Sequence, residues 1–444
     1  MKYFGTDGFR EKANEGLTAN HAFLVGQSFG AQLVKKNENP FIFIGKDTRL
    51  SGSMLEHALA AGASSVGVSV KLLGVVPTPL VSYVTAQSDA VGAVMISASH
   101  NPYYDNGIKL FNEQGEKVEA EVEMMIEKVI DKQASVELAP SNHIGTIEED
   151  EEDIEKYLNY LRESVPVDLT GYKVVLDCAN GASITTAQKI FEQTGCDLIV
   201  IHDQPDGLNI NTNCGSTHPQ DLVKQVLEHQ ADMGFAFDGD ADRCIGVNDK
   251  GELITGDEVL FLFGRYLKEN NQLENNIVVT TVMANLGLFK ALEQLDIETL
   301  STDVGDKHVF EGLEKTQGVL GGEQSGHIIF RKFSKTGDGV LTALNLAMLA
   351  SEKKQSLSQL TSDLKIYPQT LKNIVVKDKN GALENSEVID KIKDIENRLG
   401  KEGRILVRPS GTEPLVRVMV EASTQALCDQ LVDETIELIQ DLNL

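Results

Sequence analysis

The fold class of this 444-residue chain is decided by the stretch Ala90-Val-Gly-Ala-Val-Met-Ile-Ser-Ala-Ser-His-Asn-Pro-Tyr-Tyr-Asp-Asn-Gly-Ile-Lys109. Its apolar first part predicts a buried strand. An Asn-Pro pair ends that strand, and Asp105-Asn-Gly predicts a further turn. The stretch therefore predicts a strand that leads Ser99, His100 and Lys109 into a polar loop, where α/β proteins place their chemistry. The alternative is an ordinary Asn-Pro loop that happens to contain a serine.

Strands alternate with helices on both sides of this stretch. Predicted strands at 41–44, 68–74 and 90–97 are separated by helical patterns at 54–66 and 78–86. This alternation predicts βαβ units, and the pattern restarts twice further along the chain. We expect an α/β fold of three similar domains with mixed, mostly parallel sheets, followed by a smaller C-terminal α+β domain. The predicted domain boundaries are 1–155, 156–254, 255–367 and 368–444.

The composition is that of a globular protein with an acidic surface. Hydrophobic residues make up 41% and charged residues 24% of the chain, which argues against a disordered or fibrous protein. The formal net charge of -27 disfavours a nucleic-acid partner, because the polyanion would be repelled. If the substrate is anionic, positive charge has to be concentrated in one local site.

Cysteine usage and the N-terminal sequence predict a location inside the cell. The five cysteines are scattered without a C-x-x-C pair, which favours a reducing compartment over a disulfide framework or a zinc site. The start, Met1-Lys-Tyr-Phe-Gly-Thr-Asp-Gly-Phe-Arg10, is too polar for a signal peptide, and no apolar run reaches transmembrane length. We expect a soluble, cytoplasmic protein with no membrane partner.

Three alternating aspartates follow the apolar run 233–237, in Asp238-Gly-Asp240-Ala-Asp242-Arg243. Alternate residues of an extended loop point the same way, so the carboxylates should converge. Carboxylates this close need a cation between them, and all-oxygen ligation selects Mg²⁺, Mn²⁺ or Ca²⁺. The spacing imitates an EF-hand, but Arg243 stands where that loop requires glycine, and no helix precedes it. The alternative is a solvated acidic turn, which the apolar lead-in disfavours.

A second polar loop lies near the C-terminus, in Arg408-Pro-Ser410-Gly411-Thr412-Glu-Pro-Leu-Val-Arg417. The pattern predicts a strand–loop–strand unit with two arginines, two hydroxyl groups and a glycine. Guanidinium groups and backbone amides next to a glycine suit a phosphate dianion. The alternative is a β-turn with surface arginines. We favour phosphate binding, because this acidic chain gathers its scarce positive and hydroxyl donors here.

A third loop, Gly321-Gly-Glu323-Gln-Ser325-Gly-His327, lies between two strand-like runs. Glycines let a ligand approach the backbone, and Glu323 and Ser325 suit the hydroxyl groups of a sugar. His327 suits acid/base chemistry. The signal is weak by itself, because glycine-rich connections between strands are common.

Other motifs exclude function classes or stay ambiguous. The segments 4–10 and 45–52 each place an arginine beside turn residues, which also fits a purely structural turn. Gly26-Gln-Ser28-Phe-Gly30 matches the nucleophile elbow of serine hydrolases. It lies inside a helical pattern with no strand before it, so we discount a hydrolase. Nucleotide-binding signatures are absent from the sequence.

Taken together, these motifs resemble the α-D-phosphohexomutase family. The resemblance covers nearly the whole chain and rests on five motifs in order: Gly5-Thr-Asp-Gly-Phe-Arg10, Ser97-Ala-Ser99-His-Asn-Pro102, 238–243, 322–327 and 408–412. Gln324 and the segment Asn213-Cys-Gly-Ser-Thr-His218 resemble the bacterial branch of the family that acts on glucosamine phosphates. The resemblance implies four domains around one central cleft.

The resemblance also implies an activity, that of an intramolecular phosphotransferase of the isomerase class. Glucosamine 6-phosphate and glucosamine 1-phosphate would be interconverted on the route to the UDP-N-acetylglucosamine of the bacterial cell wall. Ser99 would be carried as phosphoserine, with glucosamine 1,6-bisphosphate as intermediate and activator. One Mg²⁺ per chain would be held by Asp238, Asp240, Asp242 and the phosphate on Ser99. An activating kinase and a monomeric or homodimeric state are both compatible with this activity.

The resemblance implies a role for each remaining site residue. Lys109 and His327 would form the acid/base pair, with His100 and Arg10 completing the positive site. His100 follows Ser99 directly, so their side chains would diverge on an extended segment, which disfavours a Ser–His relay. The substrate would be bound by Arg243, Glu323, Ser325, Arg408, Ser410, Gly411, Thr412 and Arg417.

Two motifs depart from the family pattern, and rival functions stay open. The usual Gly-Ile/Val-Arg-Gly start is Gly8-Phe-Arg-Glu11 here, and Gly305-Asp-Lys307-His308 replaces the Gly-Asp-Arg-Tyr of the glucosamine branch. Lysine and arginine are not equivalent in hydroxyl or phosphate recognition, so the local sugar contacts stay open. The nearest rival acts on mannose or glucose phosphates. A metal-dependent sugar phosphatase and a non-catalytic sugar-phosphate sensor are the rivals from other classes.

Overall fold

The computed structural model describes residues 1–150, 152–409 and 415–442. It divides into two compact units. The first comprises Met1–Met283 and Ile297–Ser362, and the second comprises Ala284–Asp296 and Asp363–Leu444.

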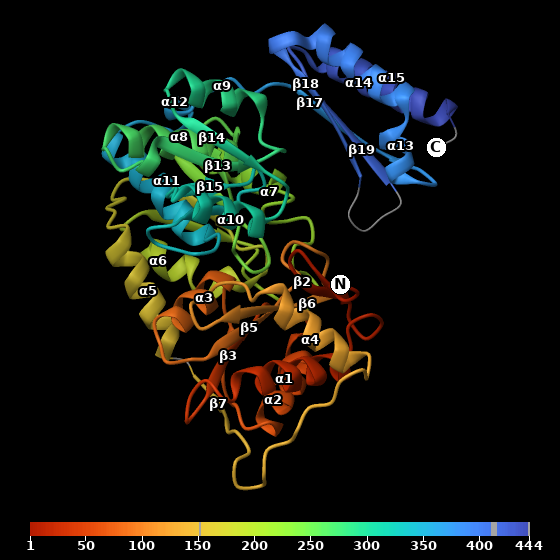
Figure 1. The fold of residues 1–444 in the computed structure, drawn as a ribbon. Helices are drawn as coiled ribbons and strands as arrows, with labels where there is room; N and C mark the ends of the chain where they lie inside the picture. The colour runs from red at the N-terminus through yellow and green to blue at the C-terminus, as the bar shows by residue number, and fades with distance from the viewer. Residues whose placement is uncertain (151, 410–414, 443–444) are drawn as a thin grey trace. The chain divides into compact units, whose positions relative to one another are not determined.

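The first unit begins with a seven-stranded sheet in the order β1-β2-β6-β5-β3-β4-β7. β3, β4, β5 and β7 run parallel to one another, whereas β6 runs antiparallel to both of its neighbours. Helices α1, α2 and α4 lie on one face of this sheet and α3 on the other (Figure 1). Its strands are β1 (Phe4–Gly5), β2 (Gly8–Lys12), β3 (Phe41–Lys46), β4 (Ser69–Val75), β5 (Gly92–Ile96), β6 (Asp105–Asn112) and β7 (Ile147–Glu149).

Two further sheets of the same unit each combine a parallel core with antiparallel edge strands. The five-stranded sheet has the order β12-β11-β10-β8-β9, and the four-stranded sheet has the order β14-β13-β15-β16. The strands of the former are β8 (Lys173–Asp177), β9 (Asp197–Ile201), β10 (Met233–Phe237), β11 (Cys244–Asn248) and β12 (Leu253–Ile254). Those of the latter are β13 (Ile277–Thr281), β14 (Glu298–Thr302), β15 (Leu320–Gly322) and β16 (Ile328–Phe330).

Helices of the first unit connect and cover these strands. They are α1 (Ala19–Leu33), α2 (Gly52–Ser65), α3 (Thr78–Ala86), α4 (Ala120–Ile130), α5 (Glu152–Ser164), α6 (Ala187–Glu192), α7 (Gln220–His229), α8 (Gly256–Glu269), α10 (Asp306–Thr316), α11 (Gly339–Lys353) and α12 (Leu357–Leu360). Short 3-10 turns occur at Ala182–Thr185 and Glu274–Asn276.

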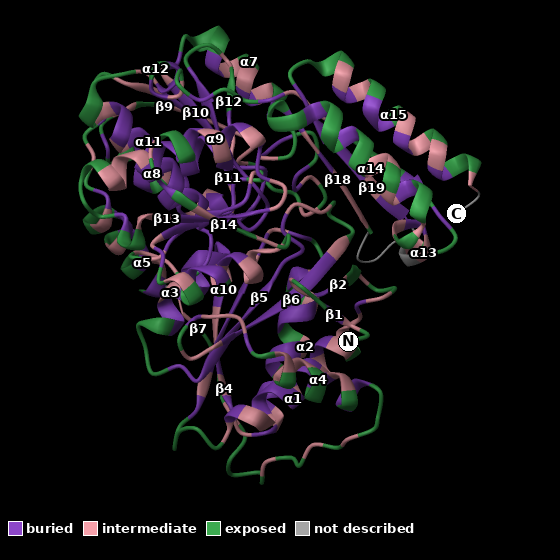
Figure 2. Cartoon of the chain, turned by 45° about the horizontal axis from the view of Figure 1, so that its top comes forward, coloured by how far each residue is buried: buried purple, intermediate pink, exposed green. Residues whose placement is uncertain are grey.

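The central strands are buried along their whole length, as apolar runs in parallel sheets predict. Every residue of β5 and of β10 is buried (Figure 2). Polar residues follow the C-terminal ends of both strands, Ser97 after β5 and Asp238 after β10. These two strand ends carry the candidate site.

The Gly26–Gly30 motif lies within α1, as its helical pattern predicts. It is a packing site, because a Cβ atom on Gly26 would lie 2.1 Å from the carbonyl oxygen of Leu59 in α2. A Cβ atom on Gly62 of α2 would in turn lie 2.1 Å from the carbonyl oxygen of Phe23. Glycine at these positions lets the two helices pack closely.

The predicted turn at Asp105 is wrong. Asp105–Asn112 form β6, which pairs with β5 and β2, and Lys109 lies opposite Met95 inside the sheet. Gly107 serves close approach and not a turn, since a Cβ atom there would lie 2.5 Å from the carbonyl oxygen of Ser97. Lys109 is therefore on a buried strand and not at the far end of the serine loop.

The second unit is built on the antiparallel sheet β17-β19-β18. Helices α14 and α15 pack on this sheet (Figure 1). Asn285, just before α9, donates hydrogen bonds to Tyr367 O (3.0 Å) and Glu421 Oε1 (3.3 Å), which ties α9 to the sheet. The elements of the second unit are α9 (Leu286–Gln294), β17 (Gln369–Val375), α13 (Lys379–Glu384), α14 (Ser386–Leu399), a 3-10 turn (Gly400–Glu402), β18 (Arg404–Pro409), β19 (Leu415–Glu421) and α15 (Gln425–Asp441).

The predicted fold class is confirmed. Three α/β sheets with parallel cores are followed by a smaller α+β sheet. None of the helices in the described ranges combines the length and the apolar character needed to span a bilayer. The exact domain boundaries stay predictions.

Candidate active site

Ser99 lies just beyond β5, on the loop that leads to β6. Its φ is +52°, in the left-handed region that few non-glycine residues adopt. The residue is 1% exposed, and its Oγ donates a hydrogen bond of 2.6 Å to Asp238 Oδ2. His100 Nδ1 lies 3.4 Å from the same Oγ. The expectation that these two side chains diverge is therefore wrong, because it assumed an extended backbone.

A buried network holds the serine loop in place. Arg49 Nη2 donates to the carbonyl oxygens of Ser99 and Asn101, both at 2.9 Å, and its Nε donates to Asp47 at 2.8 Å. Ser97 Oγ donates to Asp47 Oδ2 (2.6 Å) and accepts from the Ser99 N–H (2.8 Å). The side chains of Asp47 and Arg49 are 0% exposed. The ambiguous segment 45–52 thus supports the loop that carries Ser99.

Three aspartates converge beside Ser99, immediately after β10. Oxygen atoms of Asp238, Asp240 and Asp242 all lie within 4.8 Å of one another, and the three residues are buried. The segment is a tight turn and not an extended loop, because Ala241 has φ +54° and its N–H donates to Asp238 O at 3.1 Å. The convergence is as predicted, but the geometry behind it is different.

The aspartate cluster fits a hard divalent cation. Burial, reinforced by Asp242 and Asp240, raises the pKa of Asp238 to about 8. Among the described residues, nothing donates a hydrogen bond to the buried Oδ1 atoms of Asp240 and Asp242. Buried carboxylate oxygens without hydrogen-bond donors, gathered in one place, are suited to Mg²⁺.

Lys109 reaches the cluster from β6. Its Nζ donates to Asp240 Oδ2 (2.8 Å) and Asp242 Oδ2 (3.2 Å), and it lies 3.7 Å from Asp7 Oδ2. Burial by itself lowers the pKa of Lys109, but the three carboxylates outweigh it and raise the pKa well above its ordinary value. Lys109 is therefore charged at neutral pH and cannot accept a proton there.

Arginines, and not His100, supply the remaining positive charge. The backbone N–H of Arg243 donates to Asp238 Oδ1 (3.2 Å), and its guanidinium Nη1 lies 3.1 Å from His100 Nδ1. Burial, together with Arg243 and Arg10, lowers the pKa of His100 to about 3, so its ring is neutral and accepts a hydrogen bond from Arg243. Arg10, on β2, forms an ion pair with Asp7.

The predicted sugar loop connects β15 to β16. His327 Nε2 accepts a hydrogen bond from the Gly337 N–H (3.0 Å), and its Nδ1 lies 3.8 Å from Asp242 Oδ1. Glu323 Oε1 accepts from the Gly305 N–H (3.1 Å), and Ser325 Oγ donates to Glu323 Oε2 (3.4 Å). The structure therefore brings His327 to the aspartate cluster and fixes Glu323 beside the turn before α10.

Three contributing side chains were not predicted from the sequence. Asp7 accepts from Lys117 at 2.7 Å, and Lys117 also donates to Asp306 at 2.8 Å. Thr78 Oγ1 donates to Asp240 Oδ2 at 2.6 Å. Asp7 lies inside the N-terminal motif Gly5-Thr-Asp-Gly-Phe-Arg10, so that motif could have indicated it as a site residue. Neither Lys117 nor Thr78 stands in a recognisable pattern.

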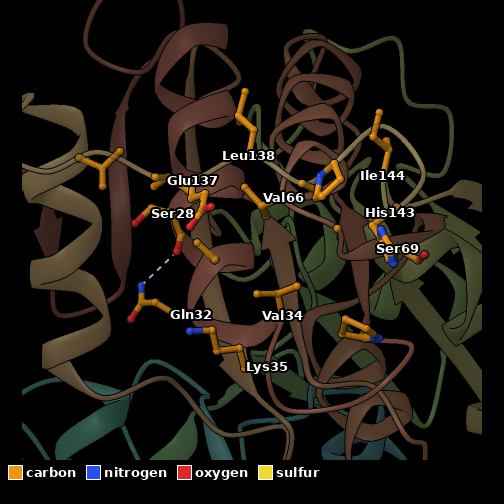
Figure 3. A pocket seen from close by; sticks show the side chains of 18 of the residues that line it. Ser28, Gln32, Val34, Lys35, Val66, Ser69, Glu137, Leu138, His143 and Ile144 are labelled. Atoms are coloured by element: carbon orange, nitrogen blue, oxygen red, sulfur yellow. Dashed lines mark hydrogen bonds between the residues drawn. The ribbon is translucent and has the colours of Figure 1, made fainter.

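Two cavities of the first unit differ in their chemistry. A cavity of about 360 Å³ is lined by Lys117, Lys307 and His327, so it adjoins the candidate site. A larger one, of about 790 Å³, lies between α1 and the segment 134–145. Figure 3 shows side chains such as Gln32 and Leu138 around it. None of the predicted site residues lines the larger cavity, so its size does not mark it as the active site.

In the second unit, Arg408 on β18 lies directly opposite Arg417 on β19. Residues opposite each other in an antiparallel pair share one face, so the two arginine side chains project from the same side of the sheet. The Nε atom of Arg417 is buried with no hydrogen-bond partner in the described part of the chain. Ser410, Gly411 and Thr412 of the predicted phosphate loop lie outside the described residues.

Profiles of four domain families match the chain in succession. They are described as the phosphoglucomutase/phosphomannomutase domains I, II, III and C-terminal, and they match residues 1–137, 155–251, 255–367 and 371–438. The chain belongs to the phosphoglucomutase/phosphomannomutase family.

Curated relatives of this family member span its whole length. A protein of Shouchella clausii named phosphoglucosamine mutase is 46% identical over 440 residues, covering 99% of both chains. A protein of Lachnospira eligens with the same name is 48% identical over 442 residues, covering 99% of this chain and 98% of its own.

Solved structures agree with the family fold. A phosphoglucomutase/phosphomannomutase family protein of Burkholderia thailandensis has a TM-score of 0.82 at 24% identity, covering 99% of this chain and 97% of that one. An N-acetylphosphoglucosamine mutase of Aspergillus fumigatus, in complex with GlcNAc-6P and magnesium, has a TM-score of 0.72 at 18% identity, covering 100% and 96%. At these identities the likeness concerns the fold.

Proposed function

We propose that this chain is an intramolecular phosphotransferase that interconverts glucosamine 6-phosphate and glucosamine 1-phosphate, the latter feeding UDP-N-acetylglucosamine synthesis. The observation that carries the proposal is the hydrogen bond of 2.6 Å from Ser99 Oγ to a buried cluster of three aspartates. The glucosamine branch is supported by curated relatives named phosphoglucosamine mutase, which align with the chain from end to end.

Asp238, Asp240, Asp242 and a phosphate on Ser99 would hold one Mg²⁺ per chain. The bound cation would neutralise phosphate oxygens as charge shifts during transfer. The pairing of Ser99 Oγ with Asp238 supports this arrangement, because a phosphate on that oxygen would start beside the cluster. The magnesium complex of the A. fumigatus structure is consistent with it.

Phosphoryl transfer takes place in two steps. In the first, the Oγ–P bond of phosphoserine 99 breaks, a bond forms from that phosphorus to the O1 hydroxyl oxygen of glucosamine 6-phosphate, the O1 hydroxyl loses its proton, and Ser99 Oγ gains one. In the second, the O6–P bond of the resulting 1,6-bisphosphate breaks, O6 gains a proton, and the phosphoryl group bonds to Ser99 Oγ, whose hydroxyl gives up its proton. Glucosamine 1,6-bisphosphate also primes an unphosphorylated Ser99; an activating kinase is the alternative route.

Lys109 and His327 are the proposed acid and base. Lys109 is charged at neutral pH and suits the donor role. His327 Nε2 is engaged by the Gly337 N–H, and its Nδ1 faces Asp242. If His327 acts as the base through Nε2, the hydrogen bond from the Gly337 N–H must break before Nε2 can accept a proton from the substrate.

The remaining contacts would bind the substrate. Arg10, Arg243 and the neutral ring of His100 face the reacting phosphate, and Glu323 and Ser325 bind sugar hydroxyl groups. The phosphate that is not reacting would be clamped by Arg408, Ser410, Gly411, Thr412 and Arg417. Arg408 and Arg417 lie opposite each other and share one face of the sheet, which would let both guanidinium groups reach one phosphate.

The proposal is tested by turnover on three substrates. Purified chain with Mg²⁺ and a catalytic amount of the 1,6-bisphosphate is given glucosamine 6-phosphate, mannose 6-phosphate or glucose 6-phosphate, and the phosphorus resonances of the products are followed. We expect the 1-phosphate isomer of glucosamine to form fastest. A preference for either neutral sugar overturns the glucosamine assignment, and release of inorganic phosphate without an isomer indicates a phosphatase.

Metal removal gives an independent check. Treatment with a chelator should abolish turnover, and added Mg²⁺ should restore it with one ion bound per chain, measured by calorimetry. Asp240→Asn should weaken Mg²⁺ binding by at least about tenfold, because it removes one of three charged ligands. Unchanged Mg²⁺ affinity in that variant would show that the cation binds elsewhere.

A further inference from the structure

A second clamp on the serine loop comes from the loop between β9 and α7. Asn211 Nδ2 donates to the carbonyl oxygen of Ser99 (2.9 Å) and to that of Asn101 (3.1 Å). These are the same two oxygen atoms that Arg49 binds. The Ser99 carbonyl is thus held between the guanidinium of Arg49 and the amide of Asn211. Asn211 lies 112 residues after Ser99 in the chain.

The position of Asn211 is itself fixed by the end of β8. The Asn211 N–H donates to the carbonyl oxygen of Ala179 (2.9 Å), whose own N–H donates to Asp177 Oδ1 (2.9 Å). The same carboxylate accepts from the Gly215 N–H (2.8 Å) through Oδ2. Asp177 is buried, and so the loop that carries Asn211 is tied to a rigid strand end on both sides.

The aspartate turn leaves room for this clamp. A Cβ atom on Gly239, between two of the clustered aspartates, would lie 2.5 Å from the Ser99 carbonyl oxygen and 2.9 Å from Asn211 Nδ2. The orientation of the amide is also determined, since its oxygen in the Nδ2 position would face two carbonyl oxygens. The buried Oδ1 has no hydrogen-bond partner among the described residues, so the amide contributes through its two donated bonds.

The clamp acts on a strained backbone. Ser99 has φ +52°, and a non-glycine residue keeps such a conformation only where its surroundings hold it. Rotation of this backbone would move Oγ away from Asp238. A residue that holds the Ser99 carbonyl therefore holds the reacting oxygen as well.

We propose that Asn211 is a positioning residue for phosphoryl transfer, which keeps Ser99 Oγ directed at the aspartate cluster through the Ser99 and Asn101 carbonyl oxygens. The proposal rests on the function proposed above. Asn211 does not touch the substrate in this role, so its loss should lower the rate of transfer and leave substrate affinity unchanged.

The test is Asn211→Leu, which removes both donors at similar volume. We expect kcat to fall by about 10- to 100-fold, because a small misplacement of the nucleophile costs this much, with KM for glucosamine 6-phosphate unchanged within about twofold. Single-turnover transfer from phosphorylated Ser99, followed by intact-protein mass after rapid quenching, should slow by the same factor. Asn211→Ser, which is too short to reach both oxygens, should show the same split if the leucine variant folds poorly.

Asn209→Leu is the matched control, on the same loop. Its side chain is half-buried and bonds to the neighbouring turn, where it accepts from the Asp206 N–H (3.1 Å) and donates to the Gln204 carbonyl oxygen (2.9 Å). This variant should keep the parental kcat. A kcat within about twofold of the parent in folded Asn211 variants overturns the proposal, as does a rise in KM that accounts for the lost activity.

The outcome is separable from that of the proposed function. If Ser99→Ala retains mutase activity, the phosphoserine mechanism fails, whatever Asn211 does. If activity requires Ser99 and the Asn211 variants turn over normally, only the positioning role fails.

Discussion

The proposed reacting centre of the first unit and the arginine pair of the second unit are built in opposite ways. Ser99 is buried, and its loop is held by Arg49, Ser97 and Asn211, so its geometry is complete without any ligand. Arg408 and Arg417 stand opposite each other on two strands, and Arg417 Nε is buried with no hydrogen-bond partner among the described residues.

This difference separates two tasks. A group that transfers phosphate must be fixed before the substrate arrives, because the rate depends on its placement. A group that binds whichever phosphate is not reacting needs charge more than fixed geometry. Changes in the first unit should therefore lower kcat or stability, and changes in the arginine pair should raise KM.

The largest expected effect is that of Ser99→Ala. It removes the phosphoryl carrier, so the mutase rate should fall at least about 1,000-fold, with the substrate still bound. Ser28→Ala is the matched control, since Ser28 belongs to the helix-packing motif in α1 and should leave the rate unchanged. Near-normal turnover of Ser99→Ala, measured in the coupled mutase assay, would rule out the phosphoserine route.

Arg49→Met should be the most destabilising of these changes. It leaves Asp47 buried without its ion pair and removes donors from the carbonyl oxygens of the serine loop, which should cost about 3–5 kcal/mol. Denaturant unfolding measures the loss. Lys71→Met is the control, because its ion pair with Asp150 (2.9 Å) is partly exposed and should contribute no more than about 1 kcal/mol. Equal losses in the two variants would contradict the structural role of Arg49.

Arg417→Met should raise KM by about 10- to 100-fold, the value of one or two charge-assisted hydrogen bonds to a phosphate, with a smaller change in kcat. Steady-state kinetics on glucosamine 6-phosphate measure both constants. Arg398→Met serves as the control, because Arg398 pairs with Glu434 on the helical side of the same unit. A fall in kcat at unchanged KM would assign Arg417 to the reacting centre and break the comparison.

The smallest effect is expected from Glu434→Gln on α15. Hydrogen bonds from Arg398 and Lys391 lower the pKa of Glu434 to about 2. A lowered folded-state pKa gives stability that is present above the ordinary glutamate pKa and is lost as the pH falls towards about 2. The variant should lose less than about 1 kcal/mol at neutral pH, because the pair is largely exposed.

Thermal unfolding at several pH values tests this expectation. The difference between Glu434→Gln and the parent should shrink as the pH falls from about 5 to about 3. Glu437→Gln, on the same helix, is the control. A difference that grows on acidification has the wrong sign for a lowered pKa and would contradict the pairing.

Much of this architecture could be predicted from local patterns. Buried strands such as β5 and β10 are apolar runs bounded by turn residues, and a period of two or of 3.6 residues is a property of the sequence itself. Ser99 and the aspartates were found because reactive side chains follow such strands directly. Their convergence was expected, although Ala241 turns the backbone where an extended loop was assumed.

The turn wrongly predicted at Asp105 has another cause, which is pairing between distant segments. Asp105-Asn-Gly has the composition of a turn, yet it starts β6, because β2 pairs with residues 105–108 and β5 pairs with the strand from Ile108 onward. The residues 105–107 do not encode those partners. Lys109 was consequently placed on a loop, and its contacts with Asp7 and Asp240 could not be expected.

The sequence by itself determined the α/β class, the order of the motifs, and Ser99 and the aspartates as candidate site residues, because these depend on residue types and short spacings. The tertiary structure alone decided how Ser99 is aimed, since its φ of +52° is held by Arg49 and Asn211, which are 50 and 112 residues away in the chain. Local patterns fix what a segment can form. Contacts between strand ends fix where its reactive atom points, and these exist only once the sheets have assembled.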